Sequence, residues 1–412
     1  MTKNIIFFYP SKIIGGAELL FARLAKYLKE KYNLNIFYID YINGFVRNNP
    51  EFACLNFIDY TDDKKTEIDI NGYLITPISN IYRLTDYVNF NDNIKLFFWC
   101  IHPFNIIHVM PENKVLLKCS SSMAKFLLTH AFKNTFKIFD TLLKYCTEKN
   151  SIYFMDYDNY ITNKMLFEKS VEENYLPVIS ITKTVFAQPN IIKKDEINIT
   201  VLGRLCKEKT TALINVLEQF NNLKTNKKKR LHIIGDGEYL NFVKSKTKKT
   251  KNVEVLFAGT LTGDKLNNYL INNTDILFSM GMSALDGAAL KLPVVLLPYS
   301  YSKIKNNKFY FLFDSKKYSL GTNIDNYKKN GNLTLENIIN LIINENKKAE
   351  IGNKCYEYYI NNHSIEQVSK KLINALDYSK LTAKEYKEIL KNTGKLIYKK
   401  SIIYKIIRSL IV

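Results

Sequence analysis

The feature that most constrains this chain is an order of short apolar segment, turn and amphipathic helix that occurs twice. The first copy has an apolar segment at residues 4–9, a glycine-containing turn at 10–16 and helical periodicity over 17–30. The second begins at 197–202 and continues into a helical pattern at 211–220. A buried strand followed by a crossover helix is the building unit of a parallel sheet covered on both faces. The order therefore predicts two Rossmann-like α/β domains.

Further apolar segments predict the remaining strands. They lie at residues 35–40, 73–78, 95–101, 231–234, 253–258, 276–279 and 293–298. Periodicity is interrupted at 177–194, which predicts a junction there. We expect a first domain over 1–180, a second over 181–378, and a basic, apolar helical tail over 379–412 that packs on the first domain or lies at a membrane surface. Two parallel sheets of this kind are expected to face one another across a cleft lined by the carboxyl ends of their strands.

Composition limits the environment in which the protein works. Hydrophobic residues make up 46% and charged residues 24% of the 412 residues, as in a globular protein. No apolar run reaches the roughly 20 residues that a membrane-spanning helix needs. The six cysteines are scattered without a C-x-x-C pair, which disfavours a zinc site and a disulfide framework. We expect a cytoplasmic protein, at the inner face of the membrane if the tail binds there.

The formal net charge of +20 calls for an anionic partner or a solvated lysine-rich surface. The anionic partners to consider are nucleic acid, an anionic membrane and a phosphate-bearing substrate. No nucleic-acid-binding motif accompanies the charge, so we expect no nucleic acid partner. The basic run at 227–230 is interpreted as polar surface that precedes a strand.

Two cations follow the first strand of the second half. Gly203 and Arg204 end the apolar segment, and Lys209 lies at the start of the next helix. Two fixed cations beside a helix N-terminus form a receptor for a diphosphate, whose charge grows as it leaves. Taken alone, the pattern favours a strand end with two surface cations.

Glycine turns follow the next three strands of the second half. Glycine allows a tight turn and close approach of the backbone to a ligand. The turn before the short helix near 282 offers free amides to phosphate, and an aspartate one turn into this helix is suited to ribose hydroxyls. The residues concerned are Gly235, Gly237, Gly259, Thr260, Leu261, Gly281, Ser283, Ala284 and Asp286.

The first half offers fewer candidates. Gly15 and Gly16 lie between the first strand and helix, where their amides would face a phosphate or an acceptor, although a simple helix-capping turn explains them too. His102 follows the strand at 95–101 and is expected to orient an acceptor, stabilise charge or act as a base, or else only to cap the strand. The sequence Asp156-Tyr157-Asp158 resembles a metal-binding D-x-D, but we interpret it as an acidic surface turn.

In their order and spacing, these motifs resemble the donor-binding domain of GT-B glycosyltransferases, particularly family 4. The resemblance covers residues 197–300. It implies that Arg204 and Lys209 hold the diphosphate of a nucleotide sugar and that Asp286 holds the ribose. The family commonly has a glutamate eight residues before its second acid, and Phe278 stands there in this chain. The glycine loop and Ser283 are expected to replace part of that role.

The resemblance implies transfer of a hexose from a nucleoside-diphosphate sugar to a glycan or lipid-linked acceptor of cell-envelope polysaccharide. It implies catalysis by His102, Arg204 and Lys209 with retention of configuration, without a metal ion or a cofactor. Peripheral contact with an anionic membrane would suit such an acceptor. Two alternatives stay open: a nucleotide-sugar epimerase or hydrolase of the same fold, and a non-catalytic transferase-like binding subunit.

Overall fold

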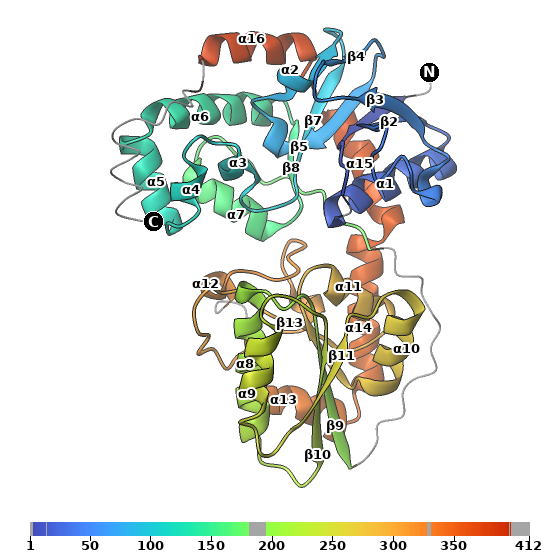
Figure 1. Cartoon of the computed structure of the whole chain (residues 1–412), viewed down its shortest axis with the longest axis vertical. Coiled ribbons are helices and arrows are strands. Elements are labelled where there is room, and N and C mark those ends of the chain that lie inside the picture. Colours follow the sequence, from blue (N-terminus) through green and yellow to red (C-terminus); the bar gives the residue numbers. More distant parts are fainter. Residues whose placement is uncertain (1–2, 14, 181–194, 328–330, 395, 397–412) are drawn as a thin grey trace. The chain divides into compact units, whose positions relative to one another are not determined.

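The structure is a computed structural model that describes residues 3–13, 15–180, 195–327, 331–394 and 396. The chain divides into two units. Unit 1 comprises Met1–Ile179 and Ile365–Val412, and unit 2 comprises Ser180–Ser364. Each unit contains one parallel sheet with helices packed on it, as the repeated strand and helix pattern predicts (Figure 1).

Unit 1 is built on a six-stranded sheet in the order β3-β2-β1-β5-β7-β8, with every pair parallel. Successive residues of β1 point to opposite faces: Ile5 and Phe7 belong to one buried cluster, and Ile6 and Phe8 to another. Both faces are therefore covered, which explains the unbroken apolar run. The strands are β1 (Asn4–Phe8), β2 (Asn35–Tyr41), β3 (Asn56–Tyr60), β5 (Tyr73–Pro77), β7 (Lys95–Cys100) and β8 (Ile152–Phe154), and β4 (Thr66–Ile68) pairs separately with β6 (Val88–Phe90).

The helices of unit 1 include two from the C-terminal part of the chain. In α15, Val368, Leu372 and Leu376 recur every fourth residue, so they share one face, and they pack into the same cluster as Leu24 of α1. The predicted second domain, 181–378, therefore extends too far, because α15 belongs to unit 1. The helices are α1 (Gly16–Tyr32), α2 (Leu84–Tyr87), α3 (Asn105–His108), α4 (Asn113–Leu116), α5 (Ser121–His130), α6 (Lys133–Glu148), α7 (Tyr157–Leu166), α15 (Ile365–Tyr378) and α16 (Ala383–Thr393).

Helix α16 covers the first part of the predicted tail. Tyr386 is fully buried, and its hydroxyl donates to the carbonyl of Ile81 at 2.8 Å. Helix α16 therefore packs on the core of unit 1. Residues 395 and 397–412, for which a membrane-surface role was the other expectation, lie outside the described residues.

Unit 2 is built on a five-stranded parallel sheet in the order β11-β10-β9-β12-β13. In both units the first strand of the sheet is central, with the next two strands on one side and the later ones on the other. The loops after the central strands thus lie at a topological switch point, where open α/β sheets bind ligands. The elements are β9 (Glu196–Leu202), β10 (Lys228–Ile234), β11 (Glu254–Gly259), β12 (Ile276–Ser279), β13 (Val294–Leu296), α8 (Lys207–Asn222), α9 (Leu240–Thr247), α10 (Gly263–Asn273), α11 (Met282–Ala289), α12 (Ile324–Tyr327), α13 (Leu335–Ile339) and α14 (Lys348–His363).

The basic run at 227–230 is part of a strand, contrary to the interpretation as surface before a strand. β10 begins at Lys228, and Lys229 is only 7% exposed. The ammonium of Lys229 donates to the carbonyls of Phe220 (3.0 Å), Asn221 (3.1 Å) and Leu223 (2.8 Å) at the end of α8. A buried cation at this position is stabilised by the carbonyl groups of the helix C-terminus, a partner that the sequence alone does not display.

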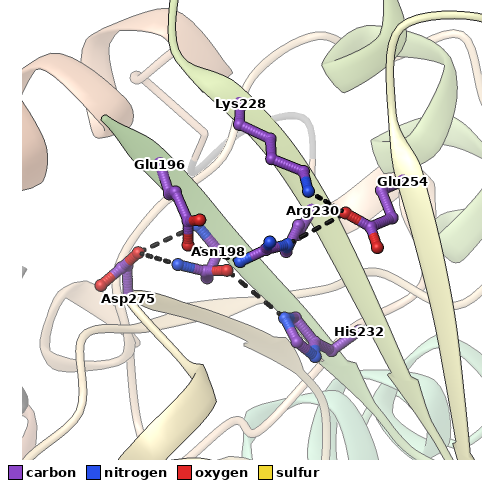
Figure 2. A network of polar contacts seen from close by, with 7 residues as sticks. All are labelled: Glu196, Asn198, Lys228, Arg230, His232, Glu254 and Asp275. Atoms are coloured by element: carbon purple, nitrogen blue, oxygen red, sulfur yellow. Dashed lines mark hydrogen bonds and ion pairs between the residues drawn. The ribbon is translucent and has the colours of Figure 1, made fainter. Parts of the chain in front are cut away.

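Alternate residues of β10 instead form a polar ladder with neighbouring strands at the amino-terminal end of the sheet (Figure 2). Arg230 forms ion pairs with Glu196 of β9 and Glu254 of β11. Asp275, just before β12, accepts from the backbone and side-chain amides of Asn198 at 2.9 and 3.1 Å. The ladder comprises Glu196, Asn198, Lys228, Arg230, His232, Glu254 and Asp275.

No helix within the described part of the chain combines the length and the apolar character that a membrane crossing requires.

The ion pair between Lys348 of α14 and Asp275 generates a stability prediction. The two groups are 2.9 Å apart, and their side chains are 11% and 3% exposed. Lys348→Met leaves a buried carboxylate without its cation, so we expect the free energy of unfolding of unit 2 to fall by about 3–5 kcal/mol in urea titrations. Lys354→Met removes an exposed pair with Glu350 on the same helix and should cost roughly 0.5 kcal/mol or less. Equal losses in the two variants would contradict this account.

Candidate functional site

Three loops at the carboxyl edge of the unit 2 sheet are joined by backbone hydrogen bonds. Gly203, which follows β9, donates its N–H to the carbonyl of Ile234 at 3.0 Å. Gly235, which follows β10, donates to the carbonyl of Gly259 at 2.8 Å. The structure therefore brings together the three strand-end glycines that the sequence pattern singles out.

Glycine is needed at two of these turns because the loops touch. The φ angle of Gly235 is +132°, and a Cβ atom there would lie 2.1 Å from the carbonyl oxygen of Gly203. Gly237 has a φ of +154°, and its Cβ would lie 2.6 Å from the carbonyl oxygen of Leu205. Any side chain would push these loops apart. The G-x-G motif thus has a structural role that precedes any contact with a ligand.

The two predicted cations lie at this edge, at the start of α8. Arg204 is exposed and Lys209 is half-buried. Neither forms an ion pair with any residue that the structure describes. Burial lowers the pKa of Lys209; Arg204 lowers it as well, whereas Cys206 and the carboxylate of Glu208 act in the opposite direction. Because the two cations repel one another and neither forms an ion pair with a described residue, an anion bound to both would relieve the repulsion.

The turn after β12 leads into α11 through Gly281. This residue has a φ of +66°, caps the helix and donates its N–H to the carbonyl of Leu320 at 2.6 Å. Ser283 is half-buried in the first turn of α11, whereas the side chain of Ala284 is fully buried. A ligand at this turn would therefore meet the backbone and Ser283, and not the methyl group of Ala284.

Asp286 is half-buried on α11, which packs against α14. Its carboxylate lies close enough to Tyr359 of α14 to contribute, after burial and Tyr356, to raising the pKa of Tyr359 to about 12. Phe278 is fully buried in β12, and its ring packs edge-on against Phe309 at 5.3 Å. The position where the resembling family carries a glutamate is thus part of the core in this chain.

Two remaining candidates follow β11. Thr260 is exposed and Leu261 is half-buried, directly after Gly259. Thr260 and Leu261 therefore extend the same edge of the sheet. Their contact with a nucleotide base stays a prediction.

In unit 1, the two predicted glycines have different roles. Gly15 is the N-cap of α1, and a Cβ there would lie 2.4 Å from Oε2 of Glu18, whereas a Cβ on Gly16 would meet nothing within 4 Å. A side chain at residue 15 would therefore displace the carboxylate of Glu18, which is 8% exposed. Burial, and secondly Glu18, raises the pKa of Tyr9 to about 12. Glu18 ends the Gly15-Gly16-Ala17-Glu18 motif but was not among the predicted site residues, although its place in the first turn of a glycine-capped helix was a usable signal.

His102 belongs to unit 1 and lies in the loop after β7. Asn105 holds this loop by accepting from the N–H groups of Ile101 (3.1 Å) and His102 (2.9 Å). The N–H of Phe104 donates to Nδ1 of His102 at 3.2 Å. Because Nδ1 accepts this bond, the neutral ring carries its proton on Nε2. His102 therefore presents an N–H donor at Nε2, which favours orientation of a substrate oxygen over action as a base.

The D-x-D segment lies beneath the same loop, and its interpretation as a surface turn is wrong. Asp156 and Asp158 are 3% and 2% exposed. Asp156 caps α7 by accepting from the backbone and side-chain amides of Asn159 at 2.8 and 2.7 Å. Burial raises the pKa of Asp156 to about 7. Asn163 of α7 donates to the carbonyl of Pro103 at 3.2 Å and so links α7 to the His102 loop.

Comparison with solved structures places both units in one known architecture. The structure is similar to the apo form of the lipopolysaccharide outer core galactosyltransferase WaaB, with 14% identity, a TM-score of 0.52, and 91% of this chain and 99% of that chain covered. It is also similar to Anabaena HepE in complex with UDP and glucose, with 11% identity, a TM-score of 0.53, and 90% of this chain and 99% of that chain covered. A third similar structure is the N-terminal domain of the trehalose-6-phosphate phosphatase of Candida albicans, with 11% identity, a TM-score of 0.53, and 92% of this chain and 98% of that chain covered.

The chain has the GT-B fold. The predicted fold class, two Rossmann-like domains with parallel sheets and C-terminal helices, is thereby confirmed. No protein-family model matches the sequence, and no curated protein matches it. Membership of family 4 and the cleft between the two sheets stay predictions.

Within the described residues, no three His, Cys, Asp or Glu side chains are grouped so that they would hold a metal ion. Metal-independent chemistry on this GT-B fold stays a prediction.

The loop geometry predicts the titration of His102. Burial, and secondly the ring of His108 at a centroid distance of 5.9 Å, lowers the pKa of His102 below its ordinary value of 6.5. We expect nitrogen-detected NMR to show a neutral ring at pH 6.5, with the proton on Nε2. His108→Gln should raise the pKa of His102, because it removes a neighbouring positive charge at low pH. A proton on Nδ1, or a pKa above 6.5, would overturn the assignment.

Proposed function

We propose that this chain is a glycosyltransferase that transfers a sugar from a nucleoside-diphosphate sugar to an acceptor. In this proposal Arg204 and Lys209 bind the diphosphate at the carboxyl edge of the unit 2 sheet. As the bond between the sugar and the diphosphate breaks, negative charge grows on the leaving group. Fixed cations stabilise that charge more strongly in the transition state than in the ground state.

The main support for the proposal is a pair of cations at the topological switch point of unit 2 that form no ion pair with any described residue. Lys209 is half-buried, and burial and then Arg204 lower its pKa, although Cys206 and Glu208 raise it. Two like charges held together are unfavourable unless an anion binds them. Two similar structures add indirect support, because one is a galactosyltransferase and the other was solved with UDP and glucose.

The other candidate residues at the carboxyl edge of the unit 2 sheet are assigned to parts of the nucleotide sugar by their positions in the loops. The turn of Gly281 and Ser283 offers backbone amides to a phosphate. Asp286 would accept from ribose hydroxyls, and the backbone at Gly259, Thr260 and Leu261 would hold the base. Gly203, Gly235 and Gly237 shape the loops that carry these groups.

On the side of unit 1, we assign His102 to a substrate oxygen through its Nε2–H. The free amides at the start of α1, beside Gly15 and Gly16, face a phosphate or the acceptor in this proposal. The acceptor is a glycan or a lipid-linked glycan of cell-envelope polysaccharide, at the inner face of the membrane. Transfer proceeds with retention, without a metal ion, as in the family 4 enzymes that the motifs resemble.

A non-catalytic binding subunit is the second candidate, because Phe278 packs in the core where the resembling family has a catalytic-site glutamate. Such a subunit would bind a nucleoside diphosphate without releasing one from a nucleotide sugar. Release of diphosphate that requires an acceptor would exclude it, and release without any acceptor would indicate a hydrolase.

The diphosphate assignment predicts the effect of three lysine and arginine substitutions. In a calorimetric titration with UDP, GDP or ADP, we expect at least one to bind the wild-type protein. Arg204→Ala and Lys209→Ala should each weaken that binding by about ten- to a hundredfold, because each removes a charge-assisted hydrogen bond.

Lys207→Ala is the matched control, since Lys207 is an exposed lysine in the same helical turn. It should leave the affinity nearly unchanged. Loss of affinity in all three variants would indicate non-specific charge attraction, and no loss at Arg204 or Lys209 would refute the assignment.

A further inference from the structure

Helix α5 of unit 1 is apolar on its outer face as well as on its inner face. Its inner face packs in the core. On the outside, Met123 is 48% exposed and Phe126 is 56% exposed. Residues three apart on a helix are neighbours, so these two side chains form one surface. His130, one turn further, stacks on Phe126 at a centroid distance of 4.4 Å.

The sequence around α5 contains basic residues and no acidic residues that would balance their charge. Between residues 113 and 139 there is no Asp or Glu, and there are five lysines: Lys114, Lys118, Lys125, Lys133 and Lys137. Lys125 pairs with Glu168 at 3.0 Å. The other four are exposed, and none of them forms an ion pair with a residue in the described ranges. Their charge is therefore available to an anionic partner.

Neighbouring elements also carry exposed apolar side chains. Helix α7 packs against α5 and carries Met165, which is 47% exposed, and Leu117 between α4 and α5 is 37% exposed. Figure 1 shows α4, α5 and α7 gathered at one end of unit 1. The name α5 face is used for the exposed residues that these segments carry, namely Lys114, Leu117, Lys118, Met123, Phe126 and Met165.

We propose that the α5 face binds the surface of an anionic lipid bilayer. Apolar side chains beside unpaired lysines fit the membrane interface, where the apolar groups enter the boundary of headgroups and acyl chains and the ammonium groups meet lipid phosphates. A second copy of this chain fits less well, because pairing the face with itself would bring its lysines together. The biological meaning rests on the proposed function, since a lipid-linked acceptor is presented at this boundary.

The chain contains a natural comparison in unit 2. Phe242 on α9 is 45% exposed and lies among lysines, one of which, Lys246, lies over its ring at 5.2 Å. The stretch around α9, residues 239–253, contains five lysines and no Asp or Glu, like the stretch around α5, but it has a single large apolar side chain that is exposed. If charge alone determined membrane binding, the two helices would be equivalent; if an apolar face is required, only α5 qualifies.

The test is flotation of the full chain with vesicles of phosphatidylcholine alone or mixed with phosphatidylglycerol. We expect binding to the anionic vesicles only, weakening as salt is raised. The double variant Met123→Ser with Phe126→Ser should lower the partition coefficient about tenfold or more. The double variant Lys114→Glu with Lys118→Glu should also lower the partition coefficient, and each of the two substitutions should contribute at least about a fivefold decrease. Phe242→Ser should leave it unchanged.

Three results would overturn the proposal. The first is that the wild-type chain does not float with anionic vesicles. The second is that the α5-face variants float like wild type, whereas the double variant Ile403→Ser with Ile407→Ser in the C-terminal segment does not. The third is that the α5-face variants change the mass measured by sedimentation, which would indicate a second copy of the chain as the occupant. Unchanged far-UV circular dichroism and melting exclude misfolding. Titration of the same variants with UDP, GDP and ADP separates the two proposals. Failure of all three to bind the wild-type protein would contradict the proposed function and leave the vesicle result intact.

Discussion

The candidate site depends on one close contact of backbone with backbone. The carbonyl oxygen of Gly203 lies where a Cβ on residue 235 would be, 2.1 Å from that position, so the loops after β9 and β10 can meet only through glycine. This contact lets the loops after β9, β10 and β11 share hydrogen bonds. It fixes the start of α8, and with it the place of Arg204 and Lys209, at the switch point of the sheet.

Sequence reasoning recovers the parts of this fold that are set by local pattern. Strands such as β1 and β9 are buried on both faces, so their continuous apolar runs are visible without a structure. The glycines at 203, 235 and 259 are visible because a turn after such a strand needs them. Sequence also indicates the two cations, because they flank a helix start, but it cannot show that neither forms an ion pair with any residue in the described chain. That property depends on residues distant in sequence.

The features that sequence reasoning missed are set by tertiary contacts. Lys229 is a strand residue because its ammonium meets the carbonyl end of α8. Asp156 and Asp158 look like a surface turn from their charge, yet the capping of α7 and the His102 loop bury them. In both cases a charged residue is buried by a partner that local propensity does not reveal. The predicted domain boundary at residue 378 was wrong for a related reason, because the periodicity of α15 does not indicate in which of the two cores the helix packs.

The main hypothesis is that Arg204 and Lys209, which form no ion pair with any described residue, hold a diphosphate. A crystal structure of the protein with the best-binding nucleoside diphosphate tests it most directly. We expect phosphate oxygens within hydrogen-bond distance of both the guanidinium of Arg204 and the ammonium of Lys209. A nucleotide bound elsewhere, with these two groups turned to solvent, would contradict it.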